Sequence, residues 1–206
     1  GGVIQADAED SLRALVKAAN VPVTSTLMGL GAYPGSDPQS LGMLGMHGTY
    51  EANMTMHETD LIFALGARFD DRVTNSPDKF SPKATIVHLD VDSASVDKII
   101  RADIALVGDA GWALNALWDA YQARDAERDP SAKEKQQQDM AKWWEQIDQW
   151  RSAHGLNHNM QPAAGQSILP QLAVQTLYRV TKGDAFVTSD VGQHQMFAAQ
   201  YYHFDE

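Results

Sequence analysis

The 206-residue sequence contains no cysteine. Disulfide bonds, thiolate zinc sites and cysteine nucleophiles are therefore excluded, and a reducing compartment is compatible with the composition. No apolar run approaches the roughly 18 residues that a membrane-spanning helix needs, so we expect no membrane partner. Basic residues are also scarce, with 16 Lys and Arg against 27 Asp and Glu and a net charge of -11. Because nucleic-acid binding needs a clustered basic surface, we expect no nucleic-acid partner.

The remaining composition is that of a globular protein, with 44% hydrophobic and 21% charged residues. No secretory signal or transit peptide is visible. The chain opens on Gly1-Gly2 and stops at "YYHFDE", soon after an expected strand and an expected helix start. We therefore expect a fragment of a longer protein.

Strands and helices alternate in the first part of the sequence. Continuous apolar runs such as "LIFALG" and "ATIVHLDVD" are typical of parallel strands that are covered on both faces. Alternation of such runs with helical patterns predicts an α/β domain over residues 1–124, with a Rossmann-like parallel sheet flanked by helices. The expected helices are 7–20, 48–60 and 110–124, and the expected strands are 21–26, 61–66, 84–92 and 102–109.

The second part of the sequence predicts an incomplete second α/β domain. Residues 125–138 are polar and indicate a linker or an exposed crossing segment. An amphipathic helix with Trp143, Ile147 and Trp150 on one side follows. Next come a helix, a strand at 185–190 and a helix start, which together resemble a first βα step. The expected division is a domain at 1–124, a linker with a helix at 125–165 and the start of a second domain at 166–206.

The stretch "LGARFDDRV" places four charges directly after an apolar strand. Such a density of charge requires either solvent or a ligand, and in open parallel sheets ligands bind outside the carboxyl ends of the strands. Thr26-Leu27, Asp90-Val91 and Gly108-Asp109 follow other expected strands. A dinucleotide across these ends would explain the segments together, because glycines admit a pyrophosphate, arginines neutralise it and aspartates accept from ribose.

An alternative explanation applies to Asp90 and Asp109, since either aspartate can merely cap a turn or a helix. The sequence also lacks the G-x-G-x-x-G fingerprint of nicotinamide-binding proteins.

The stretch "LGMLGMHGTYEANMTMH" combines glycines, methionines and histidines. A methionine stripe by itself is typical of core packing. However, Gly45 and Gly48 flank Met46-His47 just before an expected helix, so the backbone there can approach a flat ring or a phosphate.

The stretch "TSDVGQHQMFAAQ" repeats this logic, with Gln193 and His194 at a helix start that favours anions. On spacing alone, a capped helix with exposed glutamines is the safer interpretation. His154 and His158 lack a partner carboxylate or cysteine, so we predict no metal site in the chain.

Taken together, these segments resemble the large, catalytic subunit of acetohydroxyacid synthase (acetolactate synthase). The run from "STLMGLGAYPGSDP" to "LGARFDDRVT" is similar to the family's central domain, and "KGDAFVTSDVGQHQMFAAQYY" is similar to the start of its thiamine-diphosphate domain. The resemblance covers almost the whole chain and is weakest at 125–167.

The resemblance implies an enzyme that decarboxylates pyruvate and joins the hydroxyethyl group to a second 2-keto acid, such as 2-ketobutyrate. The product feeds branched-chain amino-acid synthesis. The implied cofactors are FAD without a net redox role, thiamine diphosphate and Mg²⁺. The implied partners are further copies of the chain, as a homo-oligomer, and a small regulatory subunit, in the bacterial cytoplasm.

The resemblance also assigns residues. Arg72 would hold the carboxylate of the second keto acid, with Met46 and Asp71 at the same entrance, and Arg68 would contact the FAD phosphates. The thiamine-diphosphate contacts would be Val191, Gly192, Gln193 and His194. The FAD contacts would be Gly1, Thr26, Leu27, Leu44, Gly45, Met46, His47, Gly66, Ala67, Arg68, Phe69, Asp70, Asp71, Arg72, Asp90, Val91, Asp109 and Ala110, the last standing where the family has a bulkier residue.

The family's activating glutamate and its magnesium ligands fall outside these 206 residues. We therefore expect the chain alone to make no acetolactate. Two other functions compete with this interpretation. One is another thiamine-diphosphate enzyme, such as glyoxylate carboligase or pyruvate oxidase, and the other is a non-catalytic nucleotide-binding or assembly module.

Overall fold

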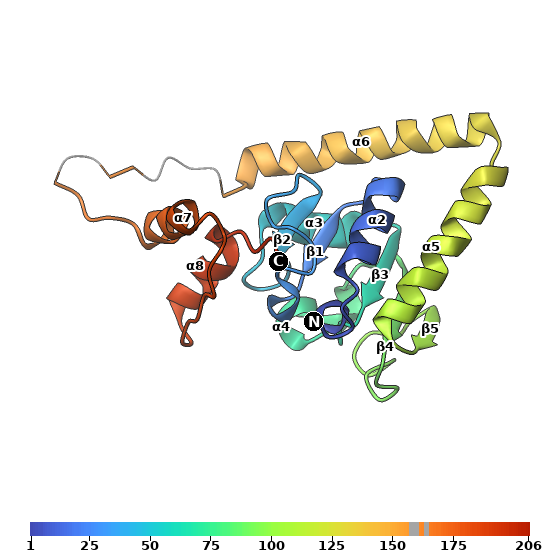
Figure 1. Cartoon of the computed structure of the whole chain (residues 1–206), viewed down its shortest axis with the longest axis horizontal. Helices are drawn as coiled ribbons and strands as arrows, with labels where there is room; N and C mark the ends of the chain where they lie inside the picture. The colour runs from blue at the N-terminus through green and yellow to red at the C-terminus, as the bar shows by residue number, and fades with distance from the viewer. Residues whose placement is uncertain (157–160, 163–164) are drawn as a thin grey trace.

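The computed structural model describes residues 1–156, 161–162 and 165–206 (Figure 1). The strands are β1 Val23–Ser25, β2 Ser40–Met43, β3 Leu61–Leu65, β4 Thr85–Asp90 and β5 Ile104–Val107. The helices are α1 Gly2–Gln5, α2 Glu9–Ala19, α3 Tyr50–Glu58, α4 Asp71–Thr74, α5 Ala110–Glu127, α6 Pro130–His154, α7 Pro170–Thr181 and α8 Gln193–Tyr201, with 3-10 turns η1 Leu27–Gly29 and η2 Pro77–Lys79. In the described part of the chain, no helix is long and apolar enough to cross a membrane.

The strands form two parallel sheets. β1 pairs with β2, and β3, β4 and β5 pair in that order. The register in the larger sheet is regular, with Leu61 opposite Thr85 and Leu65 opposite Leu89. Parallel sheets flanked by helices confirm the predicted α/β class, although the strands do not join into one sheet within the described residues.

Helices or loops cover both faces of the larger sheet at β3 and β4. On one face, Ile62 and Ile86 pack with Phe69 and, from α3, Met56. On the other face, Leu89 packs against Ala110 and Ala113 of α5. Successive side chains of each strand therefore pack in different cores on opposite faces of the sheet. This explains why the strand sequences are continuously apolar.

Strand β5 departs from the expectation of a strand covered on both faces. Ile104 is 50% exposed and Val107 is 60% exposed. Among the strands of the described residues it pairs with β4 alone, and so forms an edge of the sheet. Neither face of β5 is covered to the extent seen at β3 and β4.

Two predictions about strands were wrong. No strand was expected at residues 40–43, but they form β2, because their backbone pairs with that of β1. Residues 185–190 were expected to form a strand, but they have no regular structure, and Phe186 is fully exposed. An extended segment becomes a strand only when another strand satisfies its backbone groups. In the described part of the chain, no such neighbour lies beside 185–190.

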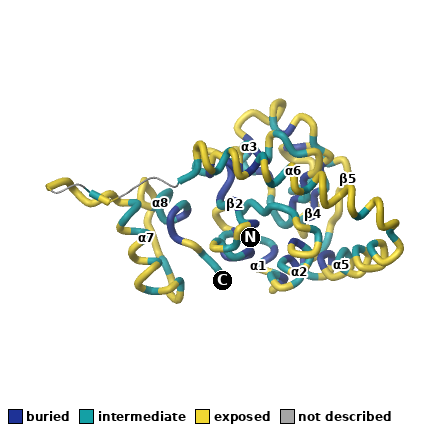
Figure 2. Tube along the Cα trace, turned by 90° about the horizontal axis from the view of Figure 1, so that it is seen from above, coloured by how far each residue is buried: buried dark blue, intermediate teal, exposed yellow. Residues whose placement is uncertain are grey.

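The polar residues 125–138 are exposed, as expected for a linker, but they are largely helical. α5 continues to Glu127, and α6 begins at Pro130, where the side chain of Asp129 caps the helix. The buried face of α6 lies further along. Ile147 is 0% exposed and packs with Leu41 and Ala52, beside Trp143 and the other tryptophans of the helix. The predicted amphipathic face is confirmed, and it fixes α6 on α3 (Figures 1 and 2). The proposed division into domains stays a prediction.

We expect Ile147→Ala to destabilise the contact of α6 with α3 by about 2 to 5 kcal/mol, because truncation leaves a cavity that the surrounding side chains fill only partly. Tryptophan fluorescence during urea unfolding would measure this, since Trp143 and Trp150 pack beside the site. Ile168→Ala is the matched control, because Ile168 is 68% exposed and its loss should cost less than about 0.5 kcal/mol. Equal costs for the two variants would contradict the assignment.

Candidate functional site

The predicted site segments follow the carboxyl ends of the strands. Thr26 follows β1, Leu44 follows β2 and Gly66 follows β3. Asp90 is the last residue of β4, and Asp109 follows β5 by two residues. Because all pairings are parallel, the ends within each sheet lie on one edge. The placement of the segments at strand ends is therefore confirmed, while their contacts with cofactors stay predictions.

The loop after β2 contacts the segment after β3 through the backbone. The amide of Met46 donates to the carbonyl oxygen of Arg72 at 2.8 Å. This approach requires Gly45, whose φ is +87°, because a Cβ there would overlap the Arg72 carbonyl. The side chain of Asn53 in α3 stabilises the loop with two hydrogen bonds. It accepts from the amide of Gly45 at 2.8 Å and donates to the carbonyl oxygen of Gly45 at 3.0 Å. The structure thus brings Met46 and Arg72, expected to share an entrance, side by side.

Gly48 has a similar role. A Cβ on this residue would lie 2.5 Å from the carbonyl oxygen of Met43. Both glycines therefore serve contacts within the protein, whereas the sequence suggested contacts with a ring or a phosphate. Thr49 caps α3 directly after the loop by accepting from the amide of Ala52.

Asp70 organises the charged segment after β3. Its carboxylate accepts from the backbone amide of Arg72 and so caps α4, and it pairs with the guanidinium of Arg68 at 2.5 Å. A hydrogen bond with Asp71 and the one from the Arg72 amide lower the pKa of Asp70, and the positive charges of Arg68 and Arg72 add to this effect. Asp70 therefore stays ionised at neutral pH and keeps Arg68 oriented.

The guanidinium of Arg72 has no hydrogen bond or ion pair to any residue that the structure describes, and the residue is exposed. Arg72 therefore presents an unpaired, forked donor at the carboxyl edge, next to Met46. Such a donor matches the geometry of a carboxylate or a phosphate. Asp71 begins α4 and is also exposed.

Phe69 lies in the same segment but points the other way. Its side chain is buried and contacts His88 and Phe80 edge to face, with ring centroids 4.9 Å and 5.8 Å apart. Its φ of +53° turns the ring into the core while the neighbouring arginines stay outside. Any contact of Phe69 with a cofactor is therefore limited to its backbone.

Exposed apolar side chains lie along the carboxyl edge beside the arginines. Leu27, Met46 and Val91 are 39%, 50% and 72% exposed. Gly66 keeps close to the backbone of Gly2, where neither residue has space for a Cβ. Apolar surfaces for flat rings, cations for phosphates and a narrow glycine contact together fit a dinucleotide such as FAD.

Both aspartates at the strand ends have capping contacts, whereas their roles toward a ligand stay predictions. Asp109 accepts from the backbone amide of Trp112 at 3.0 Å and so caps α5. Asp90 accepts from the amide of Asp92 at 2.9 Å within a turn. These contacts each use one carboxylate oxygen, which leaves the other oxygen available to a ribose hydroxyl.

The second predicted motif lies at the start of α8. Gly192 precedes the helix with a φ of +153°, and Gln193 and His194 form its first turn. Val191 is 84% exposed. Gly192 has no side chain to cap the helix, and within the described residues no side-chain cap is present, so the first backbone amides are available to an anion.

α8 lies against the loop after β2. The side-chain amide of Gln200 donates to the carbonyl oxygen of His47 at 2.9 Å. Neither Gln200 nor Asn53 was predicted as a functional residue, because a polar residue within a helix usually faces solvent. The one available signal was the position of Asn53 in the first turns after a Gly-rich loop, where a side chain can reach back to the loop.

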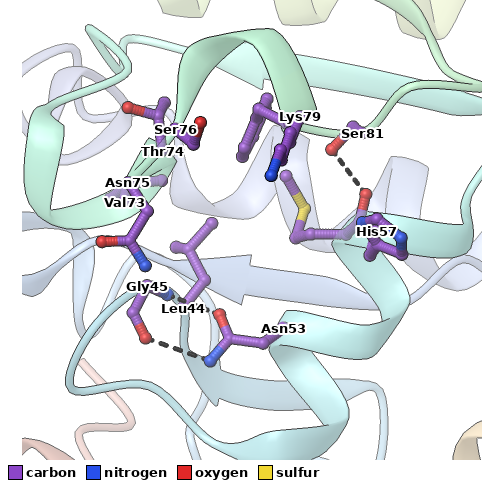
Figure 3. A pocket seen from close by; sticks show the side chains of 12 residues that line it. Leu44, Gly45, Asn53, His57, Val73, Thr74, Asn75, Ser76, Lys79 and Ser81 are labelled. Atoms are coloured by element: carbon purple, nitrogen blue, oxygen red, sulfur yellow. Dashed lines mark hydrogen bonds between the residues drawn. The ribbon is translucent and has the colours of Figure 1, made fainter.

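A hollow of about 400 Å³ lies beside this site (Figure 3). Leu44 and Gly45 of the loop after β2 line one part of it, and α3, the end of α4 and the chain that follows α4 line the rest. Met56, Val73 and Phe80 supply apolar lining, and Lys79 and His57 supply cationic or polar groups. Arg68 and Arg72 are not among its lining residues, so the hollow is separate from the arginines.

Within the described ranges, no three His, Asp or Glu side chains are arranged to hold a metal ion. Of the two histidines with helical spacing, His154 ends α6 and contacts Tyr50, with ring centroids 4.4 Å apart and the ring planes tilted by 52°. His158 lies outside the described residues.

Known proteins resemble the chain along its whole length. Residues 1–117 match the family described as thiamine pyrophosphate enzyme, central domain. The chain is 50% identical to the acetolactate synthase isozyme 3 large subunit of Escherichia coli (strain K12), with all of the chain aligned to 34% of that protein. It is 46% identical to the acetolactate synthase large subunit of Haemophilus influenzae, again with all of the chain aligned to 34% of the relative. It is 40% identical to acetolactate synthase 1, chloroplastic, of Nicotiana tabacum, with 99% of the chain aligned to 29% of the relative.

The chain spans about a third of the length of the curated relatives it matches. The match to the central-domain family covers more than half of the chain and includes the two sheets, α1 to α4 and the first part of α5. The chain therefore belongs to the thiamine pyrophosphate enzyme family and carries its central domain.

Proposed function

We propose that the chain is part of the large subunit of an acetolactate synthase, which decarboxylates pyruvate and joins the two-carbon unit to a second 2-keto acid such as 2-ketobutyrate. Identity of 50% to such a subunit over the whole chain carries this proposal. The unpaired guanidinium of Arg72 beside Met46 supports it, because the acceptor of this reaction carries a carboxylate.

The proposal assigns the carboxyl edge to FAD. Arg68 would contact the diphosphate, and Leu27, Met46 and Val91 would offer apolar surface to the rings. Asp90 and Asp109 would accept from ribose hydroxyls with the carboxylate oxygens that the caps leave available. Asp70 would contribute by keeping Arg68 oriented through their ion pair at 2.5 Å.

The proposal assigns the start of α8, from Val191 to His194, to thiamine diphosphate. The bound cofactor supplies the carbon that attacks the keto group and stabilises the resulting negative charge. The backbone amides at the helix start would donate hydrogen bonds to part of the diphosphate, and Mg²⁺ held by residues outside this chain would neutralise the rest of its charge.

Arg72 would bind the carboxylate of the second keto acid with two parallel hydrogen bonds and so orient its keto group. Met46, held beside Arg72 by the backbone contact at 2.8 Å, would cover the acceptor with an apolar surface and limit access of water. Asp71 would line the same entrance. We further propose that the full protein is a homo-oligomer with a small regulatory subunit in the bacterial cytoplasm.

The product distinguishes the proposed reaction from its competitors. Full-length protein containing this chain should convert pyruvate to acetolactate when supplied with thiamine diphosphate, Mg²⁺ and FAD. Acetyl phosphate or tartronate semialdehyde as the main product would instead indicate an oxidase or a carboligase. A flavin spectrum that persists through turnover without net oxidation is also expected. Binding of flavin with no turnover of any keto acid would favour a non-catalytic module.

We expect Arg72→Ala in the full-length enzyme to raise the Michaelis constant for the second keto acid by about tenfold to a hundredfold. A forked, charge-assisted contact contributes roughly 1.5 to 3 kcal/mol. The variant retains the backbone of residue 72. Its carbonyl oxygen still accepts from the Met46 amide, and its amide still donates to the Asp70 carboxylate. Steady-state kinetics with varied acceptor would measure the effect.

Two variants control this experiment. Arg72→Lys should restore only part of the affinity, because lysine offers a point charge in place of a planar fork. Arg101→Ala removes an exposed arginine before β5, at the opposite end of that strand, and should leave the Michaelis constant unchanged. An Arg72→Ala constant within about twofold of wild type would refute the assignment, since the expected contribution corresponds to about tenfold or more.

We expect Arg68→Ala to weaken FAD binding by about tenfold or more, because the diphosphate loses a charge-assisted contact. The carboxylate of Asp70, now without its partner at 2.5 Å, would also repel the phosphates. Flavin absorbance relative to protein after gel filtration would measure retention. Arg101→Ala is the reference variant and should retain flavin as the wild type does. A wild-type ratio of flavin to protein in Arg68→Ala would contradict the proposed role of Arg68.

A further inference from the structure

The carboxylate of Asp205 joins three separate parts of the chain. One oxygen accepts from the backbone amide of Ser36 at 2.8 Å, and the other accepts from the hydroxyl of Tyr178 at 3.1 Å. The carbonyl oxygen of Asp205 accepts from the guanidinium of Arg13 at 3.0 Å. The residue thereby connects α7 with α2 and with the loop between η1 and β2.

The loop around Ser36 is shaped to receive this segment. The amide of Gly35 donates to the carbonyl oxygen of Phe204 at 2.9 Å. A Cβ on Gly35 would lie 3.1 Å from the amide nitrogen of Phe204, so a larger residue would push the segment away. Both backbone and side-chain groups therefore form the interface between the central domain and the C-terminal unit, residues 166–206.

A second contact joins the same two units at α8. Gln200 donates to the carbonyl oxygen of His47 at 2.9 Å. Between Gln200 and Asp205 the chain is packed, with Tyr201 and Tyr202 only 5% and 3% exposed. The ring of Tyr202 also meets that of Tyr178 edge to face, with centroids 5.4 Å apart. The two contacts therefore lie at either end of one short segment whose two tyrosines are packed against the protein.

This segment connects the two sites that the proposed function assigns to different cofactors. His47 belongs to the loop proposed for FAD, and α8 begins with Gln193 and His194, proposed for thiamine diphosphate. Gln200 and Asp205 lie at the far end of α8 from those residues and belong to neither set.

We propose that Asp205 and Gln200 are positioning residues that couple the FAD site to the thiamine-diphosphate site. This inference rests on the proposed function. Ordering of the loop at His47 by FAD would fix α8 through Gln200, and Asp205 would hold the whole segment on the central domain. Binding of either cofactor then favours binding of the other, and by linkage the factor is the same in both directions.

The test measures this coupling factor in the full-length protein. The dissociation constant of thiamine diphosphate, in saturating Mg²⁺, is measured with and without FAD. In the wild type, FAD should tighten thiamine diphosphate by about fivefold or more, the usual range for coupled sites. In Asp205→Ala the factor should fall below about twofold, while FAD in the absence of the second cofactor binds with its wild-type dissociation constant.

Three variants make the result specific. Asp205→Asn should keep most of the coupling, because its amide oxygen can accept from Ser36 and its NH₂ group can donate to the Tyr178 oxygen. Gln200→Leu should lose coupling like Asp205→Ala, since leucine has a similar shape but donates no hydrogen bond to His47. Asp184→Ala is the matched control, because Asp184 is exposed in the same unit and its side chain has no partner among the described residues.

The outcomes separate this inference from the function on which it rests. Wild-type coupling retained in both Asp205→Ala and Gln200→Leu would overturn it, as would equal affinities with and without FAD in the wild type. Loss of FAD binding itself in these variants would show a general structural role and would also overturn it. A wild-type protein that binds FAD but no thiamine diphosphate would instead refute the proposed function, and the inference with it.

Discussion

The hydrogen bond from the Met46 amide to the Arg72 carbonyl is the contact on which the candidate site depends. It joins the loop after β2 to α4, which follows β3, and β2 and β3 belong to different sheets. Because it is made by backbone atoms, it survives most changes of side chain at either residue. It does not survive a side chain at Gly45, whose missing Cβ provides the space. The geometry of an acceptor site is therefore set by a residue with no functional group of its own.

Carboxylates around the site mainly hold backbone, and this leaves the arginines available. Asp70 and Asp109 cap helices, and Asp90 closes a turn. Of the two arginines after β3, Arg68 forms an ion pair with Asp70, whereas the guanidinium of Arg72 has no hydrogen bond or ion pair to the residues that the structure describes. The charges in "RFDDR" thus have two roles: Asp70 caps α4 and pairs with Arg68, and Arg72 exposes its guanidinium to solvent. A segment with arginines alone would repel itself and would lack the cap that starts α4.

Sequence patterns predicted the larger sheet and its flanking helices because those elements are specified by local apolar content. They also placed the site at the strand ends, since that follows from parallel topology. β2 escaped prediction because "SLGM" has a glycine in its middle and becomes a strand only through its pairing with β1. Residues 185–190 show the opposite case: their strand propensity is strong, but the described part of the chain provides no strand with which they could pair. Asn53 and Gln200 were missed for a third reason, since their importance lies in contacts with backbone far along the chain.

Helix α6 has a consequence for how the chain tolerates changes in length. Its 25 residues span about 37 Å, and each residue turns the helix by about 100°. The contact face at Trp143, Ile147 and Trp150 lies in the second half, while the first half is mostly exposed. One residue added within 143–150 would rotate part of this face into solvent. One residue added near Pro130 would only shift the start of α6 relative to the end of α5, where the chain is mostly exposed. Insertions and deletions should therefore accumulate there.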